Sequence, residues 1–369
     1  MNITHVVENL NRGGLERMVI ELVKLQQRQG HQCQVLCLFK SGSMADELKE
    51  IGVAVSACGK RSGLDIRALA RLRRRLRSHA TEVLHTHNAV AHYQAVLASW
   101  GLGIRRVVNT RHGMGANRRS GRREWLYRRA LARTDAVATV CEAARQDAVR
   151  RGIVPLSKAQ VIPNGIPVAA FQIVSRDRHE QLQRMLGLSA ETRLVGTVGR
   201  LNWAKDQAGL IRAFGMVCNQ LPNTVLVLIG DGELRAELEQ CAIEQGLVGQ
   251  VRFLGDRSDV HELLSGLDLF ALSSLSEGYS MALLEACATA LPIVATAVGG
   301  NGEIVRDGIT GCLVPASEPR ALADAMVALL SDPPRAGALG AAARTWVETE
   351  GSLETMAGRY AALYSGARE

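Results

Sequence analysis

The chain has 369 residues, of which 47% are hydrophobic and 22% are charged, as in globular proteins and unlike disordered or low-complexity chains. No run approaches the roughly 18 apolar residues of a membrane span, and the first residues lack the basic start and apolar stretch of a secretory signal. These features exclude an integral membrane protein and predict a cytoplasmic one.

The net charge of +8 is unevenly distributed along the chain. Residues 1–170 carry 28 Lys and Arg against 12 Asp and Glu, whereas residues 171–369 carry 16 against 24. A basic half favours nucleic acid, an anionic membrane surface or a phosphorylated substrate as partner, and charge alone does not choose among them.

Short β-branched runs alternate with amphipathic helical patterns in the first half. Its predicted strands are 3–7, 33–39, 53–57, 83–87, 106–110, 136–140 and 160–162, and its clearest helices are 15–29, 65–78 and 122–133. The pattern restarts with predicted strands 194–198, 225–229, 251–254, 269–272, 293–296 and 311–314.

This alternation predicts parallel sheets covered on both faces by helices. We therefore expect an α/β protein of two Rossmann-like, doubly wound domains that face each other across a cleft. The expected domains are 1–165 and 191–350, with a hinge at 166–190 and a C-terminal helix at 351–369 whose docking the pattern does not fix.

The usual nucleotide-binding motifs are missing from the sequence. Neither G-x-x-x-x-G-K-[ST] nor a G-x-G-x-x-G after the first strand is present, which disfavours an NTPase or a dehydrogenase. Gly13 and Gly14 instead open a helix after the first strand, where free N–H groups suit an anion. Two glycines at such a turn are also common for steric reasons alone.

Two segments of the second half carry residues suited to a nucleoside diphosphate. Arg200 and Lys205 follow a predicted strand, and a planar fork with a compact charge suits a diphosphate that must be bound and then stabilised as it leaves. Taken alone, the pair is more simply a surface Arg and a Lys at a helix start. Glu285 lies about one turn into an apolar helix, where a ribose diol would offer it two donors, although a lone Glu there is more often a surface or helix-dipole residue.

These segments together resemble glycosyltransferase family 4, whose members are retaining enzymes of the GT-B fold. The resemblance rests on GRLNWAK (199–205), the Glu277-x7-Glu285 spacing, VLIGDGE (227–233), VRFLG (251–255) and the 297–315 segment, supported by NRGGLER (11–17) and VIPNGI (161–166). It spans about residues 6–315, and the order of the motifs makes it specific.

The resemblance implies a role for individual residues. Arg200 and Lys205 would hold the donor diphosphate, Glu285 the ribose hydroxyls, and Glu277 would lie near the transferred sugar. Backbone N–H groups over Gly278, Ser280, Met281 and Ala282 would contact phosphate and sugar, Phe253 and Leu254 would flank the base, and Gly14 would lie by the phosphate or the acceptor. His112 would contact the donor sugar, where a structural histidine is the alternative.

No metal or cofactor is expected. His85 and His87 alternate along a strand and so point the same way, but no third ligand follows at a suitable spacing. The eight cysteines form no C-x-x-C pair and are expected to be reduced core residues.

We therefore expect a metal-independent, retaining transferase that moves a hexose from a UDP- or GDP-sugar to a lipid-linked or saccharide acceptor. The sequence offers no obvious carboxylate nucleophile, which favours a front-face mechanism. The alternatives are a nucleotide-sugar epimerase on the same scaffold and a basic nucleic-acid-binding protein; the latter is disfavoured because the basic stretches lack an RNA-binding aromatic pattern.

The positive charge of the first half suggests where the acceptor is met. We expect the protein to lie at the inner face of the membrane, through a basic and aromatic surface that contacts anionic lipid. This surface comprises Arg118, Arg119, Arg122, Arg123, Trp125 and Tyr127.

Overall fold

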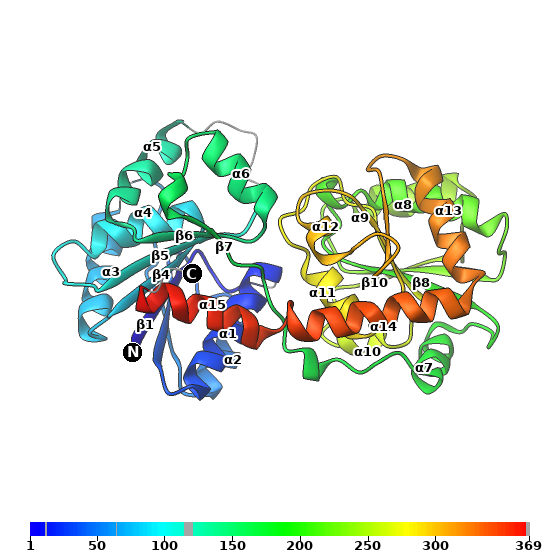
Figure 1. The fold of residues 1–369 in the computed structure, drawn as a ribbon, viewed down its shortest axis with the longest axis horizontal. Coiled ribbons are helices and arrows are strands. Elements are labelled where there is room, and N and C mark those ends of the chain that lie inside the picture. The colour runs from blue at the N-terminus through cyan, green and yellow to red at the C-terminus, as the bar shows by residue number, and fades with distance from the viewer. Residues whose placement is uncertain (12, 64, 114–120, 367–369) are drawn as a thin grey trace. The chain divides into compact units, whose positions relative to one another are not determined.

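The computed structural model describes residues 1–11, 13–63, 65–113 and 121–366. The chain divides into two compact units, which are described separately (Figure 1). Unit 1 comprises Met1–Gly165 and Leu353–Glu369, and unit 2 comprises Ile166–Ser352.

Unit 1 is built on a parallel sheet that, over the described residues, has seven strands in the order β3-β2-β1-β4-β5-β6-β7. The strands are β1 (Asn2–Val7), β2 (Gln32–Cys37), β3 (Ala54–Ala57), β4 (Val83–His87), β5 (Arg106–Arg111), β6 (Ala136–Thr139) and β7 (Ala159–Val161). The helices are α1 (Gly14–Arg28), α2 (Ala45–Glu50), α3 (Ile66–Ser78), α4 (Asn88–Ala98), α5 (Gly121–Ala130), η1 (Leu131–Arg133), α6 (Glu142–Arg150), η2 (Leu156–Lys158) and α15 (Leu353–Ser365). Helix α4 packs between α3 and α5, whereas α15 packs on α1 and β5.

Unit 2 repeats the plan with a parallel sheet that, within its described residues, has the strand order β10-β9-β8-β11-β12-β13. The strands are β8 (Arg193–Val198), β9 (Thr224–Ile229), β10 (Val251–Gly255), β11 (Leu269–Leu272), β12 (Ile293–Thr296) and β13 (Cys312–Val314). The helices are η3 (Val168–Ala170), α7 (Arg176–Leu186), η4 (Trp203–Lys205), α8 (Gln207–Cys218), α9 (Arg235–Glu244), α10 (Val260–Leu264), α11 (Met281–Ala288), α12 (Asn301–Ile304), α13 (Pro319–Leu330) and α14 (Pro333–Thr349). Helix α8 packs on α13 and α9, while α11 packs on α14 and α10.

The predicted α/β class, with two doubly wound parallel sheets, is confirmed. Each strand expected from the sequence has a counterpart whose ends differ by two residues or fewer. The central strands are continuous apolar runs such as TVLVLI in β9, which is buried along its whole length. Strands covered on both faces read in this way, which is why the sequence located them so closely.

Residues 166–190, which the sequence analysis set apart from both domains, belong to unit 2. Helix α7 begins at the Ser175 cap and ends at Gly187 in the left-handed conformation, which only glycine adopts at little cost. The Val174 N–H donates to the Thr289 carbonyl at 2.9 Å. The polar stretch that was expected to be a linker therefore forms a helix of unit 2.

The C-terminal tail of the chain is shared between the two units. Helix α14 belongs to unit 2, and the next helix, α15, belongs to unit 1. Helix α15 buries Tyr360 and Tyr364, which are 0% and 1% exposed. These side chains bring the end of the chain against α1, β4 and β5.

Candidate active site

Lys205 lies across the carboxyl end of β8. It closes the short turn η4, and a Cβ added to Gly199 would come within 3.2 Å of Lys205 Cε. Gly199 therefore leaves room for the lysine stem. Arg200, which follows Gly199, is exposed. The two predicted diphosphate ligands, Arg200 and Lys205, therefore both lie at the carboxyl end of β8.

Lys205 and Glu277 form an ion pair. Lys205 Nζ lies 2.5 Å from Glu277 Oε1, and their side chains are 19% and 10% exposed. The Ser274 hydroxyl donates to the same carboxylate oxygen at 2.6 Å. The structure thus joins a predicted phosphate ligand to the carboxylate predicted to lie near the sugar. Such an arrangement fixes the position of the ammonium group.

Glycines let neighbouring loops approach one another at this edge of the sheet. Gly299 has a φ of +53°, and a Cβ there would lie 1.8 Å from the Glu277 carbonyl oxygen. The Gly300 N–H donates to the Gly278 carbonyl at 2.9 Å. A Cβ at Gly230 would lie 2.1 Å from the Gly199 carbonyl oxygen. The sequence analysis gave no role to Gly230 or Gly299, although both fall in the segments that carry the family resemblance.

Helix α11 supplies the predicted phosphate-facing backbone. Ser280 caps it, with its hydroxyl accepting from the Leu283 N–H at 3.4 Å. The N–H groups of Met281 and Ala282 have no partner within the helix because they lie in its first turn. Glu285 is half-buried one turn further on, as expected, in a helix whose other side chains are mainly apolar.

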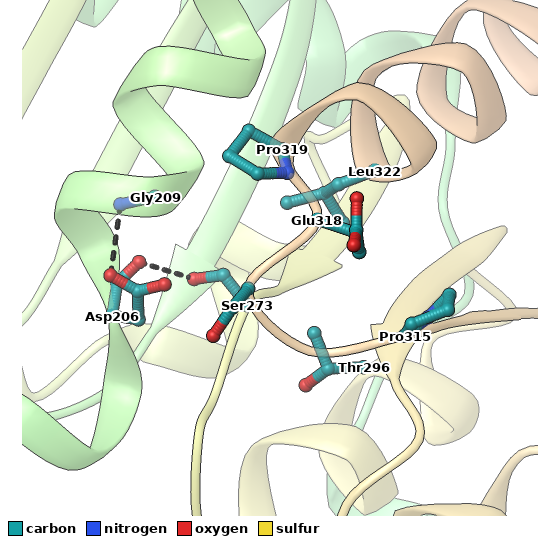
Figure 2. A pocket seen from close by; sticks show the side chains of 9 residues that line it. Asp206, Gly209, Ser273, Thr296, Pro315, Glu318, Pro319 and Leu322 are labelled. Carbon is teal, nitrogen blue, oxygen red and sulfur yellow. Dashed lines mark hydrogen bonds between the residues drawn. The ribbon is translucent and has the colours of Figure 1, made fainter.

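The remaining donor-site residues lie on β10 and around a small cavity. Phe253 and Leu254 are half-buried on β10, and the Arg235 guanidinium lies 5.7 Å from the Phe253 ring centre. A small pocket lies between the starts of α8 and α13 and has none of the predicted donor-site residues in its wall (Figure 2). Within this wall, the Ser273 hydroxyl contacts the carbonyls of Lys205 and Asp206 at 2.9 Å each. This wall supports the turn that carries Lys205.

His112 of unit 1 follows β5. Its backbone N–H donates to Asn88 Oδ1 at 3.3 Å, and its Nε2 lies 3.0 Å from His87 Nδ1. Its Nδ1 is buried and has no hydrogen-bond partner among the described residues. Burial lowers the pKa of His112 to about 3, so the ring is neutral near pH 7. Gly14, the other predicted site residue of this unit, is the first residue of α1.

A third histidine joins His85 and His87. It is His5 on the neighbouring strand β1, which is in register with His85. The ligand atoms of the three residues lie within 4.8 Å of one another. The sequence analysis missed His5, although it predicted both strands, 3–7 and 83–87, whose pairing brings His5 beside His85. Each ring nitrogen of this trio already has a hydrogen-bond partner, so a metal ion would have to displace those partners.

Of the residues predicted to form a membrane surface, the structure exposes three and buries one. Arg122 and Arg123 are exposed on α5, and Trp125 is 55% exposed, with the Arg129 guanidinium 5.2 Å from its ring centre. Tyr127 is 1% exposed and donates to Asn109 Oδ1 at 2.7 Å, so it belongs to the core. Two residues along a helix span about 200° of rotation, which places Trp125 and Tyr127 on opposite sides. Arg118 and Arg119 lie outside the described residues.

Helix α3, which like α5 packs against α4, carries further arginines. Leu72 and Leu76 are buried on this helix, and its arginines are exposed. Among the described residues, no helix is long and apolar enough to cross a membrane.

Two sequence families match this chain, one for each part. "Glycosyltransferase Family 4" matches residues 12–170, and "Glycosyl transferases group 1" matches residues 179–346. Together they span nearly all of both sheets.

Some relatives are named for the nucleotide sugar that they use. A UDP-Gal:alpha-D-GlcNAc-diphosphoundecaprenol alpha-1,3-galactosyltransferase of Escherichia coli is 26% identical over 344 residues, which are 90% of this chain and 88% of that protein. A GDP-mannose-dependent monoacylated alpha-(1-6)-phosphatidylinositol monomannoside mannosyltransferase of Corynebacterium glutamicum is 31% identical over 207 residues, 54% of each chain. The crystal structure of Anabaena HepE in complex with UDP superposes with a TM-score of 0.88 at 22% identity, over 99% of this chain and all of that one.

Proposed function

The chain belongs to glycosyltransferase family 4, with two Rossmann-like units of the GT-B type, and on that premise we propose that it moves a hexose from a UDP- or GDP-sugar to a lipid-linked or saccharide acceptor in cell-surface polysaccharide synthesis. The observation that carries the donor half of this proposal is the Lys205–Glu277 pair beside the first turn of α11. It places a cation, a carboxylate and free N–H groups at one edge of a parallel sheet, where ligands of such sheets bind.

The roles of the donor-site residues follow from their chemistry. Arg200 and Lys205 neutralise the diphosphate, Glu285 accepts hydrogen bonds from the ribose hydroxyls, and Phe253 and Leu254 flank the base. Gly278, Ser280, Met281 and Ala282 bring the backbone of the α11 start against phosphate and sugar. Gly14 lies at the start of α1, where the backbone N–H groups of the helix would bind an anion.

The transfer proceeds with retention and without a metal ion in this proposal. Positive charge from Arg200 and Lys205, with the α11 dipole, stabilises the leaving diphosphate. The Glu277 carboxylate already accepts from Lys205 and Ser274, which fits a supporting residue better than a covalent nucleophile. The acceptor hydroxyl then enters on the face from which the diphosphate leaves, and His112 contacts the sugar.

A panel of nucleotide sugars, with and without lipid-linked acceptor, tests this function. We expect one UDP- or GDP-sugar to be consumed only with an acceptor, in the presence of a chelator, with the anomeric configuration kept in the product. Interconversion of the free nucleotide sugar without acceptor would identify an epimerase instead. In parallel, Glu285→Gln should weaken nucleoside diphosphate binding by about 1.5 to 3 kcal/mol, as measured by calorimetry.

The acceptor half of the proposal rests on the exposed arginines of α3 and α5 with Trp125. Each basic residue near an anionic bilayer contributes roughly 1 kcal/mol, and Trp is suited to the headgroup level. We expect liposome co-sedimentation to rise with anionic lipid, to fall with salt, and to drop when Arg122, Arg123 and Trp125 are replaced by Ser. Binding that ignores lipid charge would favour a soluble acceptor, and a steep salt-dependent shift of nucleic acid would favour a nucleic-acid-binding protein.

A further inference from the structure

A continuous chain of hydrogen bonds connects the interior of unit 1 to His112. Gln26 Oε1 lies 2.8 Å from His5 Nε2, and His5 Nδ1 lies 3.1 Å from His87 Nε2. His87 Nδ1 in turn lies 3.0 Å from His112 Nε2. The chain stops at His112 Nδ1, which is buried and has no partner among the described residues.

Each neutral imidazole has one N–H donor and one lone-pair acceptor, so the state of one ring fixes that of the next. Gln26 Oε1 can only accept, so His5 must carry its proton on Nε2. His5 Nδ1 is then an acceptor, His87 must donate from Nε2, and His112 must donate from Nε2. By this count, His112 Nδ1 is an unprotonated lone pair.

The direction of the hydrogen-bond chain follows from the orientation of the Gln26 amide, whose Oε1 faces His5 Nε2, and two further contacts are compatible with this orientation. Gln26 Nε2 donates to the Tyr364 hydroxyl at 3.2 Å, and the Cys33 thiol donates to Gln26 Oε1 at 3.8 Å. The Tyr364 hydroxyl then donates to His85 Nδ1 at 2.7 Å. All of these donors and acceptors are used without conflict.

The histidines of this hydrogen-bond chain are neutral near pH 7. His5 and His87 are 0% and 1% exposed, and burial lowers the pKa of His5 to about 4 and that of His87 well below its usual value. A protonated ring would also place two N–H groups against each other at one of the links. The chain therefore fixes a tautomer and does not store a proton.

We propose that Gln26, His5 and His87 are positioning residues that hold His112 as a neutral Nε2–H tautomer, so that its Nδ1 accepts a hydrogen bond from a hydroxyl group of a sugar substrate. This proposal rests on the proposed glycosyl transfer for the identity of the hydroxyl. The tautomer itself is a property of the free protein. A protonated His112 would donate instead.

The test is ¹⁵N NMR of the full chain with labelled histidine, since protonated and unprotonated ring nitrogens are resolved. In the wild type, we expect His5, His87 and His112 each to carry the proton on Nε2 between pH 6 and 8. The Gln26→Leu variant should mix the two tautomers of all three rings. A protonated His112 Nδ1 in the wild type, or unchanged tautomers in Gln26→Leu, would overturn the proposal.

Kinetics separate this role from a merely structural one. We expect kcat of Gln26→Leu to fall about two- to tenfold with donor KM little changed, because only the correct tautomer is competent. The matched control is His92→Asn, since His92 is also fully buried and bonded through both nitrogens, to Thr86 and Thr134 at 2.8 and 2.9 Å, but lies off the chain. Its effect on kcat and on the His112 tautomer should be negligible, and equal losses in both variants would overturn the proposal.

A second pair of variants keeps the test independent of Gln26. Leu at position 87 removes the acceptor for His112 Nε2–H, whereas Asn offers an oxygen close to the position of the histidine Nδ1. We expect His87→Leu to lose activity and His87→Asn to recover part of it together with the His112 tautomer. Equal activity of the two variants would argue against the chain.

A zinc titration and the transfer assay distinguish the hydrogen-bond chain from a metal site and from a failure of the proposed function. Stoichiometric Zn²⁺ that shifts the ring nitrogens of His5, His85 and His87 would make the cluster a metal site and overturn the proposal. If the protein shows the expected tautomers but transfers no sugar, the proposed function is overturned and the hydrogen-bond chain is retained.

Discussion

The two units build their candidate sites from different materials. In unit 2 the site is a set of loops drawn together by backbone, with Gly299 against Glu277 and Gly230 against Gly199. In unit 1 the corresponding edge is held by buried side chains, from Gln26 through His5 and His87 to His112. The loop contacts of unit 2 require that no side chain fills the space between the loops, whereas the contacts of unit 1 require buried, neutral hydrogen-bonding side chains. The two sites should therefore be disrupted by different changes.

Acid should produce the largest effect, and it should act on unit 1. Burial lowers the pKa of His5 to about 4, that of His92 to about 3, and those of His85 and His87 well below the usual value. The unfolded chain therefore binds protons below pH 6.5 that the folded chain does not, and stability is lost as the pH falls through that value. At pH 5.5 each histidine costs about 1.4 kcal/mol, or about 6 kcal/mol for the four.

Hydrogen exchange with mass spectrometry locates this loss. Between pH 7.5 and 5.5, after correction for intrinsic rates, we expect β1 and β4 to lose protection while β8 and β11 keep it. Unit 2 is the internal control, because neither of its histidines, His179 and His261, is buried. Equal loss of protection in both units would contradict this account of the acid sensitivity.

The next largest loss of stability should come from adding a methyl group at Gly299 in unit 2. Gly299→Ala places a Cβ 1.8 Å from the Glu277 carbonyl oxygen at a φ of +53°, which combines left-handed strain with overpacking and should cost about 2 to 5 kcal/mol of unfolding free energy. Gly308→Ala is the matched control, since Gly308 has a φ of +70° and open space around it, and should cost only about 1 to 2 kcal/mol. Urea unfolding of both variants measures the difference, and similar values would show that the loops can separate.

This contrast explains what the sequence could predict. The strands are local apolar runs, so the pattern along the chain was enough to locate them. Arg200, Lys205, Glu277 and Glu285 lie in short segments at strand ends and were singled out by the family resemblance, and their roles stay predictions. The contact between Gln26 and Tyr364 spans 338 residues, and no local pattern reports it. His5 was missed for the same reason, because its neighbours come from other strands.

The sequence pattern also failed to predict which side of a helix is exposed. The run around Trp125 and Tyr127 was interpreted as one amphipathic surface, but the helix turns Tyr127 into the core, where it meets Asn109. In the same way, the polar composition of 166–190 suggested a hinge, although the segment forms α7 and is anchored to unit 2. Composition predicts polarity better than it predicts which element a polar residue belongs to.

Charge in the backbone-built site should matter more for turnover than for folding. Lys205→Ala removes an ammonium that we expect to stabilise the leaving diphosphate, and a charged hydrogen bond of this kind is worth about 1.5 to 3 kcal/mol. Turnover should fall about 10- to 150-fold, more than the donor KM rises. Steady-state kinetics with the identified donor measures both. Arg200→Lys should recover only part of the activity of Arg200→Ala, because the planar fork is lost; normal turnover in both alanine variants would place the diphosphate elsewhere.

The smallest expected effect concerns the far end of the side-chain network. Tyr364→Phe removes the hydroxyl that Gln26 Nε2 and His85 Nδ1 share at 3.2 and 2.7 Å, and leaves both groups buried without that partner. The loss should be about 1 to 2 kcal/mol of unfolding free energy. Nucleoside diphosphate binding to unit 2 should be unchanged, because α15 belongs to unit 1. Tyr93→Phe is the matched control, since Tyr93 is half-buried and packs against the apolar cluster of α3 and α4, and should change stability by less than about 0.5 kcal/mol. If urea unfolding gives the same value for both variants, α15 is held by its apolar contacts alone, and the histidine network does not depend on the C-terminal helix.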